Sequence, residues 1–252
     1  MQAPAFRARS VPELLDAAFQ VLRARYTQLL AAALVICLPA FVLGLVMPVG
    51  AELATDLVHS LLLHYAGAAT VVIVSDAYLG RERGLGDVFR AVFSRFGSVW
   101  GAGFMKNVLI VFGLLLLVVP GVYAFIVTFA MIPAVMLEGA STSESFDRSR
   151  ALARGNHARI FWTLIVAFAV MYFAFLGTSV ALLVVAELTG GVIESAFTLL
   201  SQVALTAAYP FVGTVSVLLY YDARIRNEAF DIEMLMEDAR GLGPAEAEVS
   251  AA

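Results

Sequence analysis

Long apolar stretches alternate along this chain with shorter segments in which apolar and charged residues are mixed. No Lys or Arg occurs between Thr27 and Gly80, between Asn107 and Asp147, or between Ile160 and Ala223. Stretches of about 20 apolar residues are long enough to cross the core of a bilayer as helices. The pattern therefore predicts six membrane-spanning helices, at about Thr27–Pro48, Leu57–Leu79, Val99–Val119, Val122–Leu137, Ile160–Ala186 and Ala196–Tyr221.

Prolines and one glycine are expected to shape these spans. Pro39 and Pro210 lie inside the first and sixth spans, where a proline removes a hydrogen bond and bends a helix. Pro133 is expected to interrupt the short fourth span. Pro120-Gly121 has the composition of a turn and is predicted to separate the third span from the fourth.

Three amphipathic surface helices are predicted beside the spans, at about 11–25, 86–97 and 142–155. Ser10-Val11-Pro12-Glu13 and Ser141-Thr142-Ser143-Glu144 are capping boxes, which mark helix starts. After the first box, apolar residues recur at the i, i+3, i+4, i+7 spacing of one helix face. Such helices lie in the membrane interface with the apolar face toward the lipid.

The three surface helices can be aligned with one another at their caps. The aligned sets are Ser10, Gly84 and Ser141, then Glu13, Asp87 and Glu144, then Leu15, Phe89 and Phe146. Each helix leads to an aromatic residue near the start of a span, namely Tyr26, Trp100 and Trp162. The alignment predicts a threefold internal repeat of one surface helix followed by two spans.

The composition agrees with a membrane protein. Hydrophobic residues make up 61% of the chain and charged residues 14%, and the mean hydropathy is +0.89. Soluble domains average roughly 45–50% apolar and about 25% charged residues. We therefore expect an all-α, polytopic bundle over residues 1–235, followed by a disordered cytoplasmic tail over 236–252, which ends in GPAEAEVSAA. The single cysteine, Cys37, lies inside the first span and is expected to pack there as a small apolar residue.

The basic residues predict the orientation. All arginines lie before span one, between spans two and three, between spans four and five, or after span six, and the three opposite turns contain no Lys or Arg. By the positive-inside rule, both termini and the three surface helices are expected to be cytoplasmic. A bacterial plasma (inner) membrane is the expected location.

Several segments together resemble a known membrane domain. They are SVPELLDAAFQVLRARY, VVPGVYAFIVTFAMIPAVMLEG, SFDRSRALARGN and LLYYDARIRNEAFD. They are similar to the membrane domain attached to some bacterial glycerophosphoryl diester phosphodiesterases, and to related uncharacterised six-span bacterial membrane proteins. The resemblance implies location and fold. In those phosphodiesterases a separate soluble barrel carries the catalytic residues and a divalent metal, so no catalytic residue is assigned to this chain.

Two groups of charged residues are candidate sites. Asp76 and Lys106 lie inside spans two and three and are candidates for an intramembrane charge pair, because intramembrane charges usually pair, snorkel or line an ion pathway. A structural pair or snorkelling is expected, with a proton or ion route as the alternative. Five arginines are candidates for contact with lipid headgroups: Arg148, Arg150, Arg154, Arg224 and Arg226.

Other polar residues in the spans have structural interpretations. His59 and His64 are five residues apart and so do not share a helix face, as a two-histidine zinc site requires. Gly177-Thr178-Ser179 resembles the serine motif of intramembrane proteases, but the sixth span contains no histidine to serve as its base. Gln202 is expected to hydrogen bond between helices.

The sequence therefore predicts a non-enzymatic integral membrane protein, acting as a scaffold or accessory module through lipid or protein contacts. No catalytic, cofactor or metal site is predicted. Membrane lipids, and a protein partner or a second copy of the chain, are the expected partners, and nucleic acid is not. The alternative is a small-solute or ion-coupled transporter that works through Asp76 and Lys106. An enzyme acting on glycerophospholipid rests on the resemblance alone.

Overall fold

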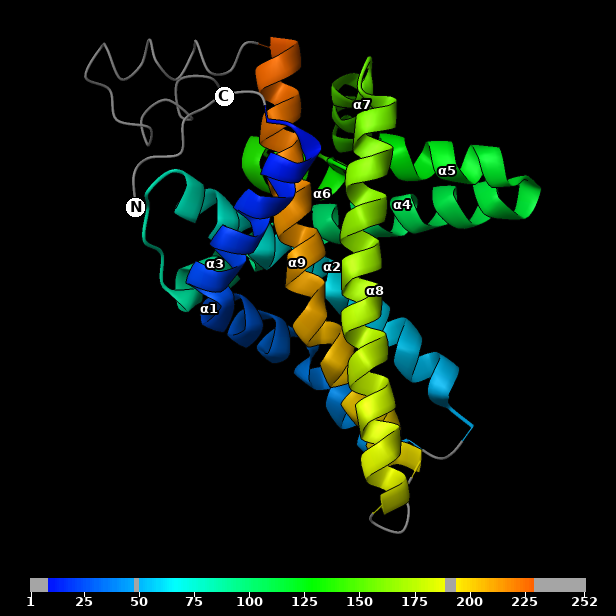
Figure 1. Cartoon of the computed structure of the whole chain (residues 1–252). Coiled ribbons are helices and arrows are strands. Elements are labelled where there is room, and N and C mark those ends of the chain that lie inside the picture. The colour runs from blue at the N-terminus through cyan, green and yellow to red at the C-terminus, as the bar shows by residue number, and fades with distance from the viewer. Residues whose placement is uncertain (1–8, 48–49, 189–193, 229–252) are drawn as a thin grey trace.

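The computed structural model describes residues 9–47, 50–188 and 194–228, and these residues form helices with no strands. Figure 1 shows the long helices α1, α2, α8 and α9 gathered into one bundle. In order, the helices are α1 (Val11–Val46), α2 (Glu52–Tyr78), α3 (Leu85–Ser94), α4 (Phe96–Leu116), α5 (Val118–Val127), α6 (Met131–Pro133), η1 (Ala134–Glu138), α7 (Thr142–Ala153), α8 (His157–Leu188) and α9 (Glu194–Glu228). The predicted tail over 236–252 lies outside the described residues.

Six helical segments are long and apolar enough to cross a membrane, which confirms the predicted class of polytopic helix bundle. The outer surface of α8 shows why a bilayer is needed. Trp162, Phe173 and Leu188 are 60%, 68% and 81% exposed, on a helix that packs mainly against α9. Apolar surface of this extent is rare on soluble monomers, and lipid tails would cover it.

The first surface helix and the first span form one continuous helix. The sequence predicts two elements, at 11–25 and 27–48, whereas α1 runs from Val11 to Val46 without a break. It starts at the predicted capping box, in which Ser10 accepts from the backbone N–H of Glu13 and the Glu13 carboxylate accepts from Ser10. No glycine or proline stands between the two predicted elements, so nothing in the local sequence ends the helix there.

The three helix starts also bury matching positions. Counted from the caps Ser10, Gly84 and Ser141, the fourth residue is Leu14, Val88 and Ser145, and the eighth is Ala18, Val92 and Ser149. All six are fully buried. The three amphipathic segments therefore face the bundle in the same register, as expected for the predicted repeat.

Helices α4 and α5 form a closely packed hairpin that projects sideways from α8 (Figure 1). A Cβ placed on Gly113 would lie 2.8 Å from the Cα of Gly121, so the two backbones touch where neither residue has a side chain. The helices separate at Leu117, which has an extended backbone, and not at the predicted Pro120-Gly121 turn. Pro120 lies in the first turn of α5, where its missing N–H removes no helical hydrogen bond.

Span four breaks near Pro133, as predicted, into α5, α6 and η1. The segment η1 is a π-helical turn in which the N–H of Gly139 donates to the carbonyl of Ala134, five residues back. Gly139 ends it with a left-handed backbone, at φ 75°. Such turns are rare and occur often at functional sites. This one directs the chain from the bundle core toward α7.

Candidate functional site

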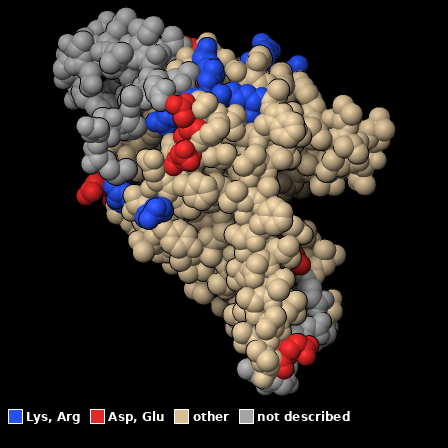
Figure 2. Space-filling view, in the orientation of Figure 1, with Lys and Arg blue, Asp and Glu red and all other residues tan. Residues whose placement is uncertain are grey.

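Arginine side chains gather at one end of the bundle, which we call the charged end (Figure 2). On the face shown, no Lys or Arg is visible in the lower part of the molecule, where the only coloured charged atoms are those of Asp and Glu. The charged end contains the start of α1, the end of α2, α3, α7, the start of α8 and the end of α9. Its chemistry depends on which of the arginines already have carboxylate partners.

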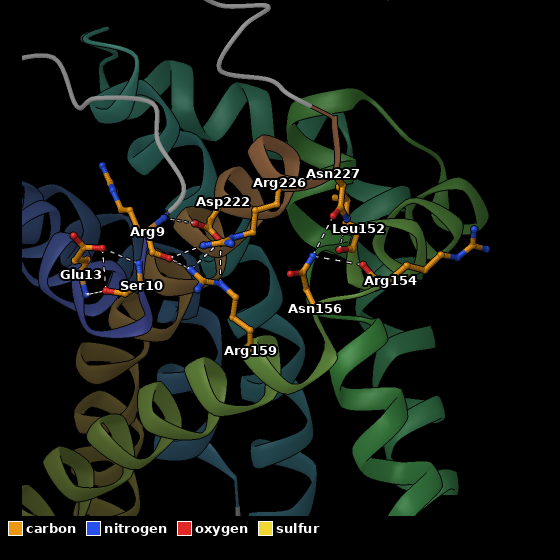
Figure 3. A network of polar contacts seen from close by, with 10 residues as sticks. All are labelled: Arg9, Ser10, Glu13, Leu152, Arg154, Asn156, Arg159, Asp222, Arg226 and Asn227. Atoms are coloured by element: carbon orange, nitrogen blue, oxygen red, sulfur yellow. Dashed lines mark hydrogen bonds and ion pairs between the residues drawn. The ribbon is translucent and has the colours of Figure 1, made fainter.

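Asp222 contacts residues from three parts of the chain at the charged end (Figure 3). Its carboxylate is 4% exposed on the side chain and accepts from the backbone N–H of Arg9 at 2.8 Å. It also accepts from Arg159 at 2.9 Å and from Arg226 at 2.9 Å. Both guanidinium groups donate in addition to the carbonyl of Arg9. One buried carboxylate therefore fixes the residues before α1 against α8 and α9.

Arg148 bridges two further carboxylates. Its guanidinium contacts Glu138 at 2.7 Å and also binds Glu228 in a two-bonded arrangement. The Tyr220 hydroxyl donates to Glu138 at 2.6 Å. Burial opposes the charge of Arg148, but the hydrogen bonds that it donates to Glu228 and Glu138 outweigh the burial and raise the pKa of Arg148 above the ordinary value. Arg148 is thus a charged link between η1, α7 and α9.

Three of the five predicted headgroup arginines are therefore engaged with protein groups. Arg148 holds Glu138 and Glu228, Arg226 holds Asp222, and Arg224 contacts Glu228 at 3.2 Å. Arg150 and Arg154 are exposed on and after α7, and their guanidinium groups form no hydrogen bond or ion pair with the described part of the chain. Of the five arginines predicted to contact lipid headgroups, only Arg150 and Arg154 therefore have guanidinium groups that are not already bound to a described protein group.

The predicted pair of Asp76 with Lys106 is not found. Asp76 contacts Arg83 at 3.1 Å, because the short connection after α2 brings Arg83 back to the helix end. Lys106 lies one turn from Gly103, against which the His64 ring packs. His64 is twelve residues before Asp76 on α2, a separation of roughly 18 Å along a helix. Lys106 and Asp76 therefore sit at different depths.

A cavity of about 230 Å³ opens beside Asp76, and we call it the arginine cavity. It lies between the end of α2, α3 and η1. Its polar lining comes from Ser75, Asp76, Arg81, Arg83, Ser94 and Arg95, and the rest of the wall from Val72, Ala91, Met136 and Leu137. Three arginines thus face one carboxylate, so the cavity has the charge of an anion site.

Arg95, on the wall of this cavity, has no carboxylate bound to it among the residues that the structure describes. It stands at the junction of α3 and α4, and its side chain forms no ion pair with any described residue. Its guanidinium lies against the backbone of Gly139, since a Cβ on Gly139 would come within 2.9 Å of Arg95 Nη1. The π-helical turn that ends at Gly139 therefore forms part of the surface against which the Arg95 side chain packs.

The arrangement can bind a compact anion. Guanidinium groups form paired hydrogen bonds to phosphate oxygens, and these are among the stronger hydrogen bonds in proteins. The volume is below the roughly 300–1,000 Å³ of pockets for drug-sized ligands, which favours a small anionic group. From the sequence, Arg81, Arg83 and Arg95 are recognisable only as positive charges beside a span, because nothing local shows that they meet around one cavity.

Searches of family models, of curated proteins and of solved structures give no match for this chain. The similarity to the membrane domain of glycerophosphoryl diester phosphodiesterases therefore stays a prediction from the segments in which it was seen.

Proposed function

We propose that the protein is a non-catalytic integral membrane module that binds the phosphate of an anionic phospholipid in the arginine cavity. The single observation that supports this is the group of three arginines around a cavity with one carboxylate, where Arg95 has no ion-pair partner among the described residues. An anion there would supply the missing partner for Arg95.

The surroundings of the cavity favour a lipid over a free phosphate ester. Phe93 and Phe96 flank Arg95 and are 53% and 54% exposed, so acyl chains have an apolar surface to follow. Part of the cavity wall is also apolar, from Val72 and Met136 among others. A phospholipid whose phosphate lies at the arginines and whose acyl chains lie along the phenylalanines would match both the charged and the apolar surface.

The orientation is part of the proposal. We place the charged end in the cytoplasm of a bacterial cell, since arginines are retained on that side of the plasma membrane. The inner leaflet holds anionic lipids, so the cavity would lie at the level of their headgroups. The alternative of a transporter that works through Asp76 and Lys106 has no contact between these residues to support it.

The test is thermal stabilisation of the purified protein, in an uncharged detergent, by short-chain lipids. Dioctanoyl phosphatidylglycerol should raise the melting temperature, and dioctanoyl phosphatidylcholine should not. Arg95→Gln should weaken the effect by about tenfold or more, the value of one hydrogen bond to a charged group. Arg90→Gln is the matched control, because Arg90 is an exposed residue of α3, the helix that ends just before Arg95, and it pairs with Asp87.

Equal stabilisation of the wild type and Arg95→Gln would contradict the proposal. Glycerol 3-phosphate is the second probe. If it stabilises the wild type at the same concentration as the lipid, the ligand is a free phosphate ester and the lipid assignment is wrong.

A further inference from the structure

A second cavity, of about 370 Å³, lies at the end of the bundle opposite the arginines. We call it the α2–α9 cavity. The first turns of α2 contribute Asp56, His59, Ser60 and Leu63, and the first turns of α9 contribute Thr198, Ser201, Gln202 and Leu205. Each set has the spacing i, i+3, i+4, i+7, so each is one face of its helix. Phe175 of α8 and Phe197 complete the wall.

Gln202 joins the two helix faces. It is 4% exposed, and its amide Nε2 donates to Asp56 Oδ1 at 3.1 Å. A carboxylate only accepts hydrogen bonds, which fixes the amide with its nitrogen toward Asp56. The predicted hydrogen bond between helices is thus confirmed.

The carbonyl oxygen of the same amide has no partner. Gln202 Oε1 is buried, and no donor of the described residues reaches it. Ser201 Oγ, on the same wall, is also buried without a partner in the described structure. Leaving a buried acceptor without a donor is unfavourable, so a donor from outside the chain is expected at this position.

His59 cannot provide that donor. Thr206 Oγ1 has one hydrogen and gives it to the carbonyl of Gln202, at 2.8 Å. The 2.8 Å contact between His59 Nε2 and Thr206 Oγ1 therefore requires the imidazole to donate from Nε2. That hydrogen is used in the contact with Thr206.

We propose that the α2–α9 cavity binds a small organic ammonium ion, with its N–H groups shared between the Asp56 carboxylate and Gln202 Oε1 and its apolar part between Phe175 and Phe197. Four features of the cavity agree with this ligand class. The carboxylate supplies the opposite charge, and the orphan carbonyl accepts an N–H. Aromatic rings attract cations. The volume is within the range of small-molecule pockets, and larger than a bare metal ion needs.

A metal ion fits less well. No group of three or more His, Cys, Asp and Glu side chains that could hold one is present in residues 9–47, 50–188 and 194–228. The two phenylalanines and two leucines of the wall also offer nothing to a hydrated ion. The proposal does not depend on the arginine cavity, which shares none of these residues.

The test compares two probes of nearly equal shape, benzylammonium and benzyl alcohol, by isothermal titration calorimetry on the full chain in an uncharged detergent. Benzylammonium should bind at least about tenfold more tightly, which is the value of one hydrogen bond to a charged group. Equal affinities for the two probes would overturn the proposal without any variant.

Asp56→Asn should remove the preference for the ammonium probe and still accept the Gln202 hydrogen bond. Asp147→Asn is the matched control, because it removes the same charge from the exposed surface of α7 at the charged end. Phe175→Leu keeps every polar group of the cavity. It should weaken the binding of benzylammonium several-fold, because the aromatic ring is lost. Unchanged benzylammonium binding in both Asp56→Asn and Phe175→Leu would show that the cavity residues are structural only.

Discussion

Replacing Arg148 with Gln is expected to destabilise the charged end. Apart from the arginines that contact Asp222, no other arginine should have as large an effect on stability when it is replaced. Arg148 holds Glu138 and Glu228 at once, and the side chains are 26%, 24% and 30% exposed. Without the guanidinium, two carboxylates are left close together with no cation between them, except that Arg224 remains near Glu228.

The magnitude follows from the partial burial. Exposed ion pairs contribute about 0–1 kcal/mol, and removing one partner of a fully buried pair costs about 3–5 kcal/mol. Side chains that are about a quarter exposed lie between these limits, so we expect the free energy of unfolding to fall by about 2–3 kcal/mol. For a chain of this size that corresponds to a melting temperature lower by about 4–12 °C.

The assay is thermal unfolding in detergent, followed by the loss of the monodisperse peak in size-exclusion chromatography. Arg150→Gln is the matched control, since Arg150 is exposed on the same helix and should change stability by less than about 0.5 kcal/mol. A double-mutant cycle with Glu138→Gln should give a coupling of about 1 kcal/mol or more. A melting temperature of Arg148→Gln equal to that of Arg150→Gln would refute the reasoning.

Three other predictions concern packing, pH and topology. Gly113→Ala should destabilise the α4–α5 hairpin by about 1–3 kcal/mol in the same thermal assay, because the new Cβ meets the backbone of α5 at 2.8 Å. Hydrogen bonds from the side chain and backbone of the N-cap serine hold the pKa of Glu144 below 4.5, so its charge stabilises α7 above that pH. The stability difference between the wild type and Glu144→Gln should be constant near neutral pH and shrink as the pH falls below 4.5. Ser143→Cys should react with an impermeant maleimide only in opened cells, and Leu53→Cys in intact cells.

Each of these has a control. Gly97→Ala introduces the same methyl group into α4 where nothing lies within 4 Å, and should be neutral or stabilising. A Glu144→Gln difference that does not change with pH would exclude a role of the charge. The wild type reports the background of the labelling, because its one cysteine, Cys37, is fully buried. Labelling of Ser143→Cys in intact cells would reverse the proposed orientation.

Features that depend on nearby residues could be predicted from the sequence. The two capping boxes need only residues three apart, and both are present. The six apolar segments and the burial of Cys37 follow from composition along single helices. The break between α4 and α5 lies a few residues before the predicted turn, because a proline is as acceptable in the first turn of a helix as in a turn.

Features that depend on packing between distant segments could not be predicted from the sequence. The sequence predicts a pair of Asp76 with Lys106 because neighbouring spans are expected to align, whereas in the structure the connection after α2 supplies Arg83 as the partner of Asp76. Two of the three partners of Asp222, Arg159 and Arg9, come from 63 and 213 positions away. Periodicity alone marks the polar faces of α2 and α9, but only the packed bundle shows that they meet in one cavity.

The most direct test of the proposed lipid site is native mass spectrometry of the protein released from vesicles of equal parts phosphatidylglycerol and phosphatidylethanolamine. The wild type and Arg90→Gln should retain one phosphatidylglycerol, and Arg95→Gln should lose it. Retention of phosphatidylglycerol by Arg95→Gln at the wild-type level, or equal retention of both lipids by the wild type, would contradict an anion site in the arginine cavity.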